Sequence, residues 1–148
     1  MVPREDNEVR LHIYRRFVDD GRPPTPAETA EALGMPLARS ETSYRHLAES
    51  RVIVLHPGTT DIWMANPLSA VPTPFLVETG GRSYFGNCAW DALGIPPMLG
   101  QDGRIRTSCP DCDEAIGLEV RSNAIRPVEA VAHFAVPAAR WWEDIGYT

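Results

Sequence analysis

The spacing of apolar residues along the chain changes near residue 51. Before that point they recur every three or four positions, as in Val9, Ile13 and Phe17. This spacing puts side chains on one face of a helix and predicts a first helix over residues 6–19. After residue 51 the apolar runs become short, β-branched and separated by turn residues. The chain is therefore expected to be helical in its first third and β-rich afterwards.

Two further helices are expected before the change. Thr25 precedes a proline and lies three residues before Glu28, which is the pattern of a capping box at the start of a helix, and Gly34 ends that helix. A third helix is expected over residues 36–50. The segment "RVIVLHPGTTDIWMANP" then has two β-prone runs around a turn. Three helices and a hairpin predict a winged helix-turn-helix-like unit over residues 1–67.

Residues 68–148 are predicted to form a second unit, a small and mostly antiparallel β domain. Two strands flank Gly80 and Gly81, and "GRIRTSC", "AIGLEVRSN" and "EAVAHFAVP" supply three more. A short helix is expected at residues 88–93, inserted between strands. The fold class is therefore α+β, with the helical bundle packed on the β domain.

The charge balance argues against a nucleic-acid partner. The chain has 14 basic residues, all arginine, against 20 acidic residues, for a net charge of −6. The expected recognition helix alternates arginine with glutamate, so its contribution to phosphate binding would be small. No apolar run is long enough to span a membrane, and the N-terminus is unlike a secretory signal, so a cytoplasmic location is expected.

Cys88 and Asp91 are the candidate catalytic residues. Asn87 is a good N-cap, so Cys88 is expected in the first turn of the short helix, where the helix dipole would lower the pKa of its thiol. Asp91 lies three residues on and shares the same face, so thiolate and carboxylic acid would act on one small ligand. Trp90 is a candidate for the pocket wall. The alternative is a buried, inert cysteine beside a solvent-facing aspartate.

Three stretches together resemble the alkylmercury lyase family: "CAWDALGIPPMLG", "RIRTSC" and the winged-helix-like N-terminal part. The resemblance implies protonolysis of a carbon–mercury bond, in which two cysteine thiolates take the mercury and an aspartate moves a proton to the departing carbon. Cys88 resembles the first catalytic cysteine, Asp91 the catalytic aspartate, and Cys109 a structural cysteine. The implied partners are a small organometallic substrate and external thiols, with no organic cofactor.

Two departures from the family pattern leave alternatives open. No residue matches the second catalytic cysteine, which is expected about where the sequence ends at Thr148, so either a shortened chain or a relative with another activity fits. The other departure is Cys112, which makes a Cys-x-x-Cys turn with Cys109. That spacing suits two ligands of a tetrahedral metal ion, for which Cys88 and His133 are the available additions.

The alternative function is therefore a non-catalytic thiolate protein that binds zinc, copper or mercury through Cys88, Cys109 and Cys112. A bound metal ion would be mercury as product in the first case, or zinc or copper in the second. A third alternative is a DNA-binding regulator with a thiol sensor domain. The apolar ending "ARWWEDIGYT" would favour self-association, so a homodimer is also an expectation.

Overall fold

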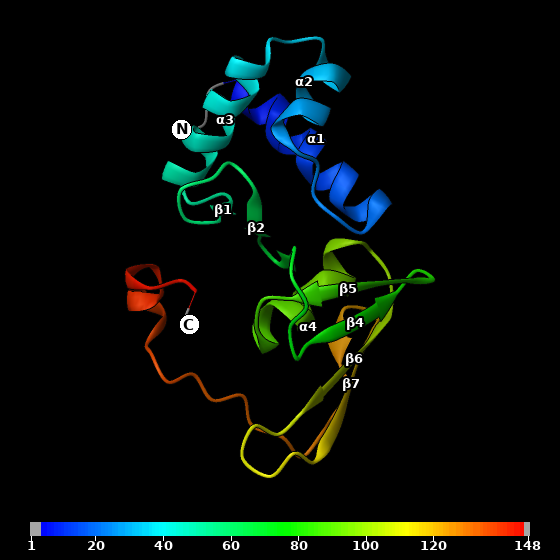
Figure 1. The fold of residues 1–148 in the computed structure, drawn as a ribbon. Coiled ribbons are helices and arrows are strands. Elements are labelled where there is room, and N and C mark those ends of the chain that lie inside the picture. The colour runs from blue at the N-terminus through cyan, green and yellow to red at the C-terminus, as the bar shows by residue number, and fades with distance from the viewer. Residues whose placement is uncertain (1–3, 147–148) are drawn as a thin grey trace.

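A computed structural model describes residues 4–146 and has a helical layer above a curved antiparallel sheet (Figure 1). The α+β class is confirmed. None of the described helices is both long and apolar enough to cross a bilayer. In chain order the elements are α1 (Arg4–Asp20), α2 (Pro26–Leu33), α3 (Leu37–Glu49), β1 (Val54–Leu55), β2 (Ile62–Ala65), β3 (Leu68–Ser69), β4 (Leu76–Thr79), β5 (Arg82–Gly86), α4 (Ala89–Met98), β6 (Gly103–Ser108), β7 (Ala115–Arg121), β8 (Ala124–Ile125) and the 3₁₀ helix η1 (Ala138–Glu143).

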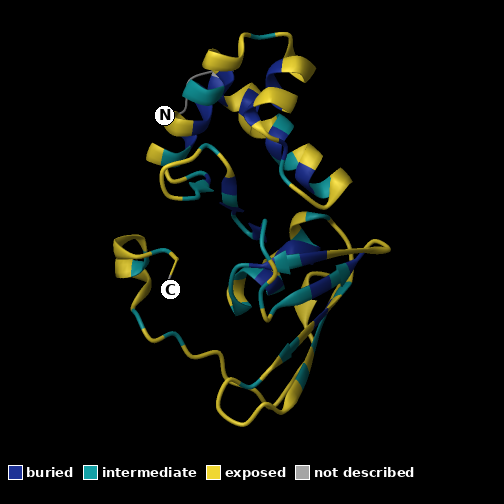
Figure 2. Ribbon diagram, viewed as in Figure 1, coloured by how far each residue is buried: buried dark blue, intermediate teal, exposed yellow. Residues whose placement is uncertain are grey.

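The first three helices form where the sequence predicts them. The stripe of Val9, Ile13 and Phe17 on α1 is completely or almost completely buried, and it packs in one core with Tyr44 and Leu47 of α3. Buried residues line the inner faces of the bundle, whereas its outer faces are exposed (Figure 2). The helices therefore owe their stability to one shared apolar face rather than to intrinsic propensity alone.

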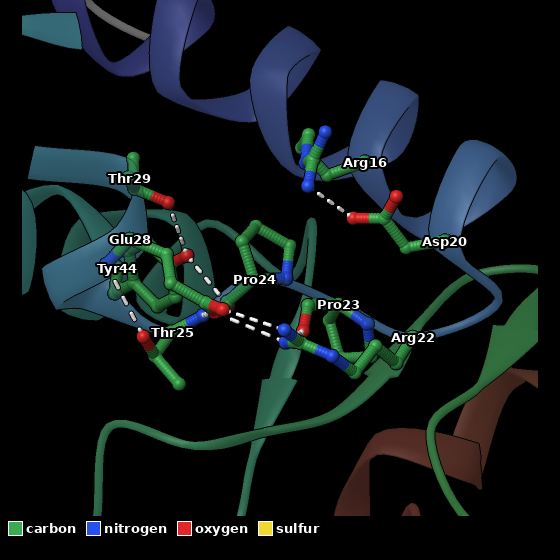
Figure 3. Close-up of polar contacts among 9 residues, drawn as sticks. All are labelled: Arg16, Asp20, Arg22, Pro23, Pro24, Thr25, Glu28, Thr29 and Tyr44. Atoms are coloured by element: carbon green, nitrogen blue, oxygen red, sulfur yellow. Dashed lines mark hydrogen bonds and ion pairs between the residues drawn. The ribbon is translucent and has the colours of Figure 1, made fainter. Parts of the chain in front are cut away.

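The start of α2 is held by the predicted capping box. The Thr25 hydroxyl accepts the Glu28 N–H at 3.2 Å, and the Glu28 carboxylate accepts the Thr25 N–H at 2.7 Å (Figure 3). The buried Tyr44 hydroxyl lies 2.8 Å from the Thr29 hydroxyl and donates to the Pro24 carbonyl at 2.9 Å. The loop before α2 is thus tied to α3 through the Tyr44 hydroxyl, whose hydrogen bonds offset its burial.

All the described strands belong to one antiparallel sheet, in the order β1-β2-β3-β5-β4-β6-β7-β8. The β1–β2 hairpin and the strands around "GRIRTSC" and "AIGLEVRSN" are confirmed. Gly80 and Gly81 form the two-residue turn between β4 and β5, with φ of 58° and 75°. Two successive positive φ angles are required by a type I′ turn, which explains the glycine pair.

The helical bundle is joined to the rest of the sheet by β5. Its Tyr84 hydroxyl donates to the Val18 carbonyl at 2.9 Å, and its Arg82 guanidinium donates to the Asp19 carbonyl. These carbonyls lie in the last turn of α1, where no intrahelical donor is available. The sheet is also continuous across the predicted boundary at residue 67, because β2 before it pairs with β3 after it. The division into units at residues 1–67 and 68–148, and the winged helix-turn-helix likeness, stay predictions.

The strand predicted over "EAVAHFAVP" is wrong. After β8 the chain leaves the sheet and crosses open space before η1 (orange in Figure 1). Its apolar residues do not pack against the sheet, since Val128 is 45% exposed and Val131 is 92% exposed. Pro127 and Pro137 also lack the N–H that a ladder requires. His133 lies in this exposed segment, so its prediction as a residue of an apolar strand is wrong too.

Candidate functional site

A pocket of about 260 Å³ lies at the start of α4. A larger and shallower depression of about 460 Å³ surrounds the β4–β5 turn, but none of its lining residues is a cysteine. The smaller pocket is therefore the candidate site. It is lined from three parts of the chain: Met64 and Asn66 from the end of β2, Asn87, Cys88 and Asp91 around the start of α4, and Trp141, Trp142, Ile145 and Gly146 from the C-terminal segment.

The helix that carries the thiol and the carboxyl differs from the prediction in its start and its length. Cys88 itself, with φ of −147°, is the N-cap residue, and the expected role of Asn87 as N-cap is wrong. The helix also continues to Met98 instead of ending at residue 93. Pro96 and Pro97 lie within its last turns, where the fixed φ of proline is compatible with a helix, although each proline lacks a backbone N–H and its ring crowds the carbonyl four residues before it.

A close contact between α4 and β5 sets the position of Cys88. A Cβ on Gly86 would lie 2.7 Å from the backbone of Ala92, so only glycine allows the helix to pack this tightly against the strand. Ala92 is completely buried at that contact. Cys88 lies two residues after this strand end, where the chain turns from β5 into α4. The thiol is therefore placed by two rigid elements rather than by a free loop.

The pKa of the Cys88 thiol is raised, not lowered. Burial in the pocket is the largest cause, because it disfavours the thiolate, and the negative charge of Asp91 acts in the same direction. The backbone N–H groups of Asp91 and Trp90 favour the thiolate, as a helix start should, but they do not outweigh burial. The predicted lowering of this pKa is therefore wrong.

Asp91 shares the pocket with Cys88, as the three-residue spacing predicts. Burial raises the pKa of its carboxyl, while hydrogen bonds from the Asn87 amide and the Cys88 thiol oppose that rise. Asn87 Nδ2 donates to Asp91 Oδ2 at 3.1 Å and to Asn66 Oδ1 at 3.0 Å. The Asn87 amide therefore holds the Asp91 carboxyl in one orientation within the pocket.

The network around Asp91 reaches the helical bundle. The Tyr14 hydroxyl of α1 donates to the Asn66 carbonyl at 2.9 Å, and the charge of Asp91 contributes to raising the pKa of that tyrosine, after the larger effect of burial. Asn66 therefore links α1 to the pocket. The sequence offers no local signal for Asn66 or Tyr14, because their contacts with the site join residues far apart in the chain.

The aromatic side of the pocket comes from the C-terminal segment. Trp142 in η1 lies 5.3 Å from the Arg51 guanidinium carbon, which faces its ring. Gly146 packs on the Trp63 ring, where a Cβ would approach to 2.5 Å. Trp141 donates from Nε1 to the Val136 carbonyl at 2.8 Å. These contacts fold residues 138–146 back over Cys88 and Asp91, so the wall is formed by residues distant in sequence.

Trp90 does not contribute to that wall. Its side chain is 70% exposed and it is absent from the pocket lining. Residues 88 and 91 share one helical face, and the residue between them at position 90 points away from it. The prediction of Trp90 as a pocket residue is therefore wrong, and Trp141 and Trp142 line the pocket instead.

The remaining candidate metal ligands do not gather around Cys88. Cys109 and Cys112 lie in the β6–β7 turn (yellow in Figure 1), and neither they nor His133 line the pocket. Within residues 4–146, no three His, Cys, Asp or Glu side chains are grouped so as to hold a metal ion. The described residues therefore do not bring the predicted ligands Cys88, Cys109, Cys112 and His133 together.

The pKa of the Cys88 thiol is raised from its ordinary value and that of the Cys109 thiol is lowered, so the two cysteines should react with an alkylating agent over different pH ranges. The pH at which alkylation by iodoacetamide reaches half its maximal rate should be higher for Cys88 than for Cys109. The pKa of Cys109 is lowered mainly by the backbone N–H groups of Cys112 and Asp111. Mass spectrometry of the two peptides over a pH series measures both rates in one sample. Equal inflection points for the two cysteines would contradict the burial argument.

Comparisons with known proteins agree on one family. The family model MerB, alkylmercury lyase, matches residues 68–148. Over 73 residues the chain is 29% identical to the alkylmercury lyase of Staphylococcus epidermidis, which is 47% of this chain and 34% of that protein. The fold is similar to the crystal structure of the mercury-bound form of MerB2, with a TM-score of 0.66 and 25% identity over 85% of this chain and 60% of that one. The matched region thus spans about a third of the curated relative.

Proposed function

Since the chain belongs to the alkylmercury lyase family, we propose that it cleaves carbon–mercury bonds by protonolysis in the Cys88 pocket. The observation that carries the proposal is that Cys88 and Asp91 line one pocket and both have raised pKa values. A soft thiol sulfur binds mercury, and a carboxyl group that easily takes and returns a proton serves as the acid. The two groups lie on one helical turn, as a single small substrate requires.

The reaction is an exchange of a proton for mercury. The Cys88 thiol gives its proton to Asp91 as its sulfur binds the mercury of R–Hg–SR′, where SR′ is an external thiolate. Asp91 then delivers that proton to the carbon, and the carbon–mercury bond breaks. The products are R–H and Cys88–S–Hg–SR′, so atoms and charge balance. Asp91 regains its carboxylate in the same step, and the Asn87 amide stabilises that charge.

The pocket wall suits the organic group of such a substrate. Trp141, Trp142 and Ile145 offer apolar surface opposite the thiol, and Met64 adds a thioether. An alkyl or aryl group is held there by burial of apolar area. A volume of about 260 Å³ admits a small group such as methyl or phenyl rather than a large one. Small organomercurials are therefore the proposed substrate class.

A second thiolate is proposed to come from an external thiol. No other cysteine in residues 4–146 lines the pocket, so the ligand that completes mercury coordination arrives with the substrate. Exchange with further thiol then removes the mercury from Cys88. Such thiols are abundant in the reducing cytoplasm, where the reaction is proposed to occur. No organic cofactor takes part.

The test is headspace gas chromatography of benzene, with the 148-residue chain, phenylmercury acetate and excess thiol. Benzene should accumulate in proportion to protein, and repeated turnover should depend on the thiol. In D₂O the benzene should carry one deuterium, because the proton comes from a pocket group that exchanges with solvent. Benzene release no faster than in the protein-free thiol blank would overturn the proposal.

A further inference from the structure

The β6–β7 hairpin carries a rigid turn that the proposed cleavage does not use. Two backbone hydrogen bonds close the turn that contains its residues "CPDC". The Cys109 N–H donates to the Glu114 carbonyl and the Asp113 N–H donates to the Cys109 carbonyl, each at 2.9 Å. Asp113 has a φ of 60°, which closes the turn. Because both strands on either side belong to the sheet, the positions of the two cysteines are fixed by the backbone.

Cys109 and Cys112 are three residues apart in the turn that these two backbone hydrogen bonds close. The backbone N–H groups of Cys112 and Asp111 are the largest causes of a lowered pKa of the Cys109 thiol, and the neighbouring Cys112 side chain acts in the same direction. Both cysteines are free of disulfide bonds, and Cys112 is exposed. The closed turn therefore presents two neighbouring free cysteines, one half-buried and one exposed.

The number of ligands available at the turn indicates which metal ion it could bind. A structural zinc site uses four ligands, and the described part of the chain brings no third His, Cys, Asp or Glu to these two. Mercury(II) is a softer ion that is satisfied by two thiolates. Two free cysteines in one closed turn, with no third ligand among the described residues, therefore fit mercury(II) better than zinc.

We propose that Cys109 and Cys112 form a two-thiolate chelate for mercury(II), separate from the Cys88 pocket. This inference rests on the proposed function only in taking mercury as the ion that the protein meets. The ion arrives as a complex with external thiols and is transferred by exchange: Hg(SR′)₂, one thiolate and one thiol of the turn give Cys109–S–Hg–S–Cys112, R′S⁻ and R′SH. The pair thus binds the ion that cleavage releases, without entering the cleavage step.

The test uses the Cys88→Ser variant, which leaves the turn as the only pair of cysteines. After incubation with mercury(II) chloride and excess 2-mercaptoethanol, followed by gel filtration, it should retain about one mercury per chain as a monomer. The Cys88→Ser/Cys112→Ser variant should bind mercury at least about tenfold more weakly and should therefore retain much less of it after gel filtration. The reason is that a single thiolate lacks the effective concentration supplied by a neighbouring one. Cys112 is exposed, and circular dichroism checks that both variants are folded.

Two results would overturn the chelate. Equal retention by the two variants would mean that one thiolate suffices, and half an equivalent of mercury in a species of doubled mass would mean that the ion bridges two chains. Both readouts are independent of benzene release, because neither variant contains Cys88. Failure of the chelate is therefore distinguishable from failure of the proposed cleavage.

Discussion

Replacement of Cys88 by serine should lower the rate of benzene release from phenylmercury by about 10³-fold or more, a loss typical of removing a nucleophile. Serine keeps the size of the side chain, and its hydroxyl still reaches Asp91, but oxygen is a hard ligand that does not displace thiolate from mercury. The position of α4 should not change, because its contact with β5 is made by Gly86 and Ala92. Initial rates measured by gas chromatography give the ratio.

A matched control for that variant is Trp90→Ala. Trp90 belongs to the same helical turn, but its side chain is 70% exposed and lies outside the pocket. This variant should retain the wild-type rate within about twofold, since surface substitutions away from the site change little. A Cys88→Ser variant as active as Trp90→Ala would show that cleavage occurs elsewhere, or that external thiol alone carries it.

Local sequence signals predicted most of the secondary structure. The stripe of Val9, Ile13 and Phe17 identified α1, the Thr25 capping box identified the start of α2, and the Gly80-Gly81 pair identified the β4–β5 turn. Each signal is confined to a few neighbouring residues and acts through the backbone or one apolar face. The same holds for Cys88 and Asp91, whose shared pocket follows from their spacing on one helix.

The prediction for the Cys88 pKa was wrong because burial is a long-range property. A helix start favours the thiolate, and the N–H groups of Asp91 and Trp90 do act in that direction. The larger effect comes from segments distant in sequence, among them Met64 in β2 and Trp141 in η1. The residues next to Cys88 in the sequence carry no signal that these distant segments cover its side chain. Apolar burial therefore outweighs the dipole, and only the folded chain reveals this.

The tryptophans show the same division between local and distant information. Trp90 was predicted in the pocket because it stands between Cys88 and Asp91, yet neighbours in a helix point in different directions. Trp141 and Trp142 lie some fifty residues further along the chain and form the wall instead. Their placement depends on the contacts of Arg51 with Trp142 and of Trp63 with Gly146, which join the C-terminal segment to β2 and the loop after α3.

Replacement of Asp91 by asparagine should separate mercury binding from cleavage. The side chain keeps its size, and its carbonyl oxygen still accepts the Asn87 amide, so the pocket keeps its shape. What is lost is the group that takes the thiol proton and returns it to carbon, and the rate of benzene release should fall by about 10² to 10⁴-fold. Binding of phenylmercury to Cys88, followed by mass spectrometry of the intact adduct, should persist.

The adduct and the released benzene together test the role of Asp91. An Asp91→Glu variant provides the comparison, because it retains a carboxyl group but moves it by one methylene, and it should recover part of the lost rate. Removal of the negative charge in Asp91→Asn should also lower the pKa of Cys88, so the adduct should still form without the carboxylate as proton acceptor, while benzene release is slower. Loss of both adduct and benzene would instead mean that Asp91 organises the pocket rather than carrying the proton.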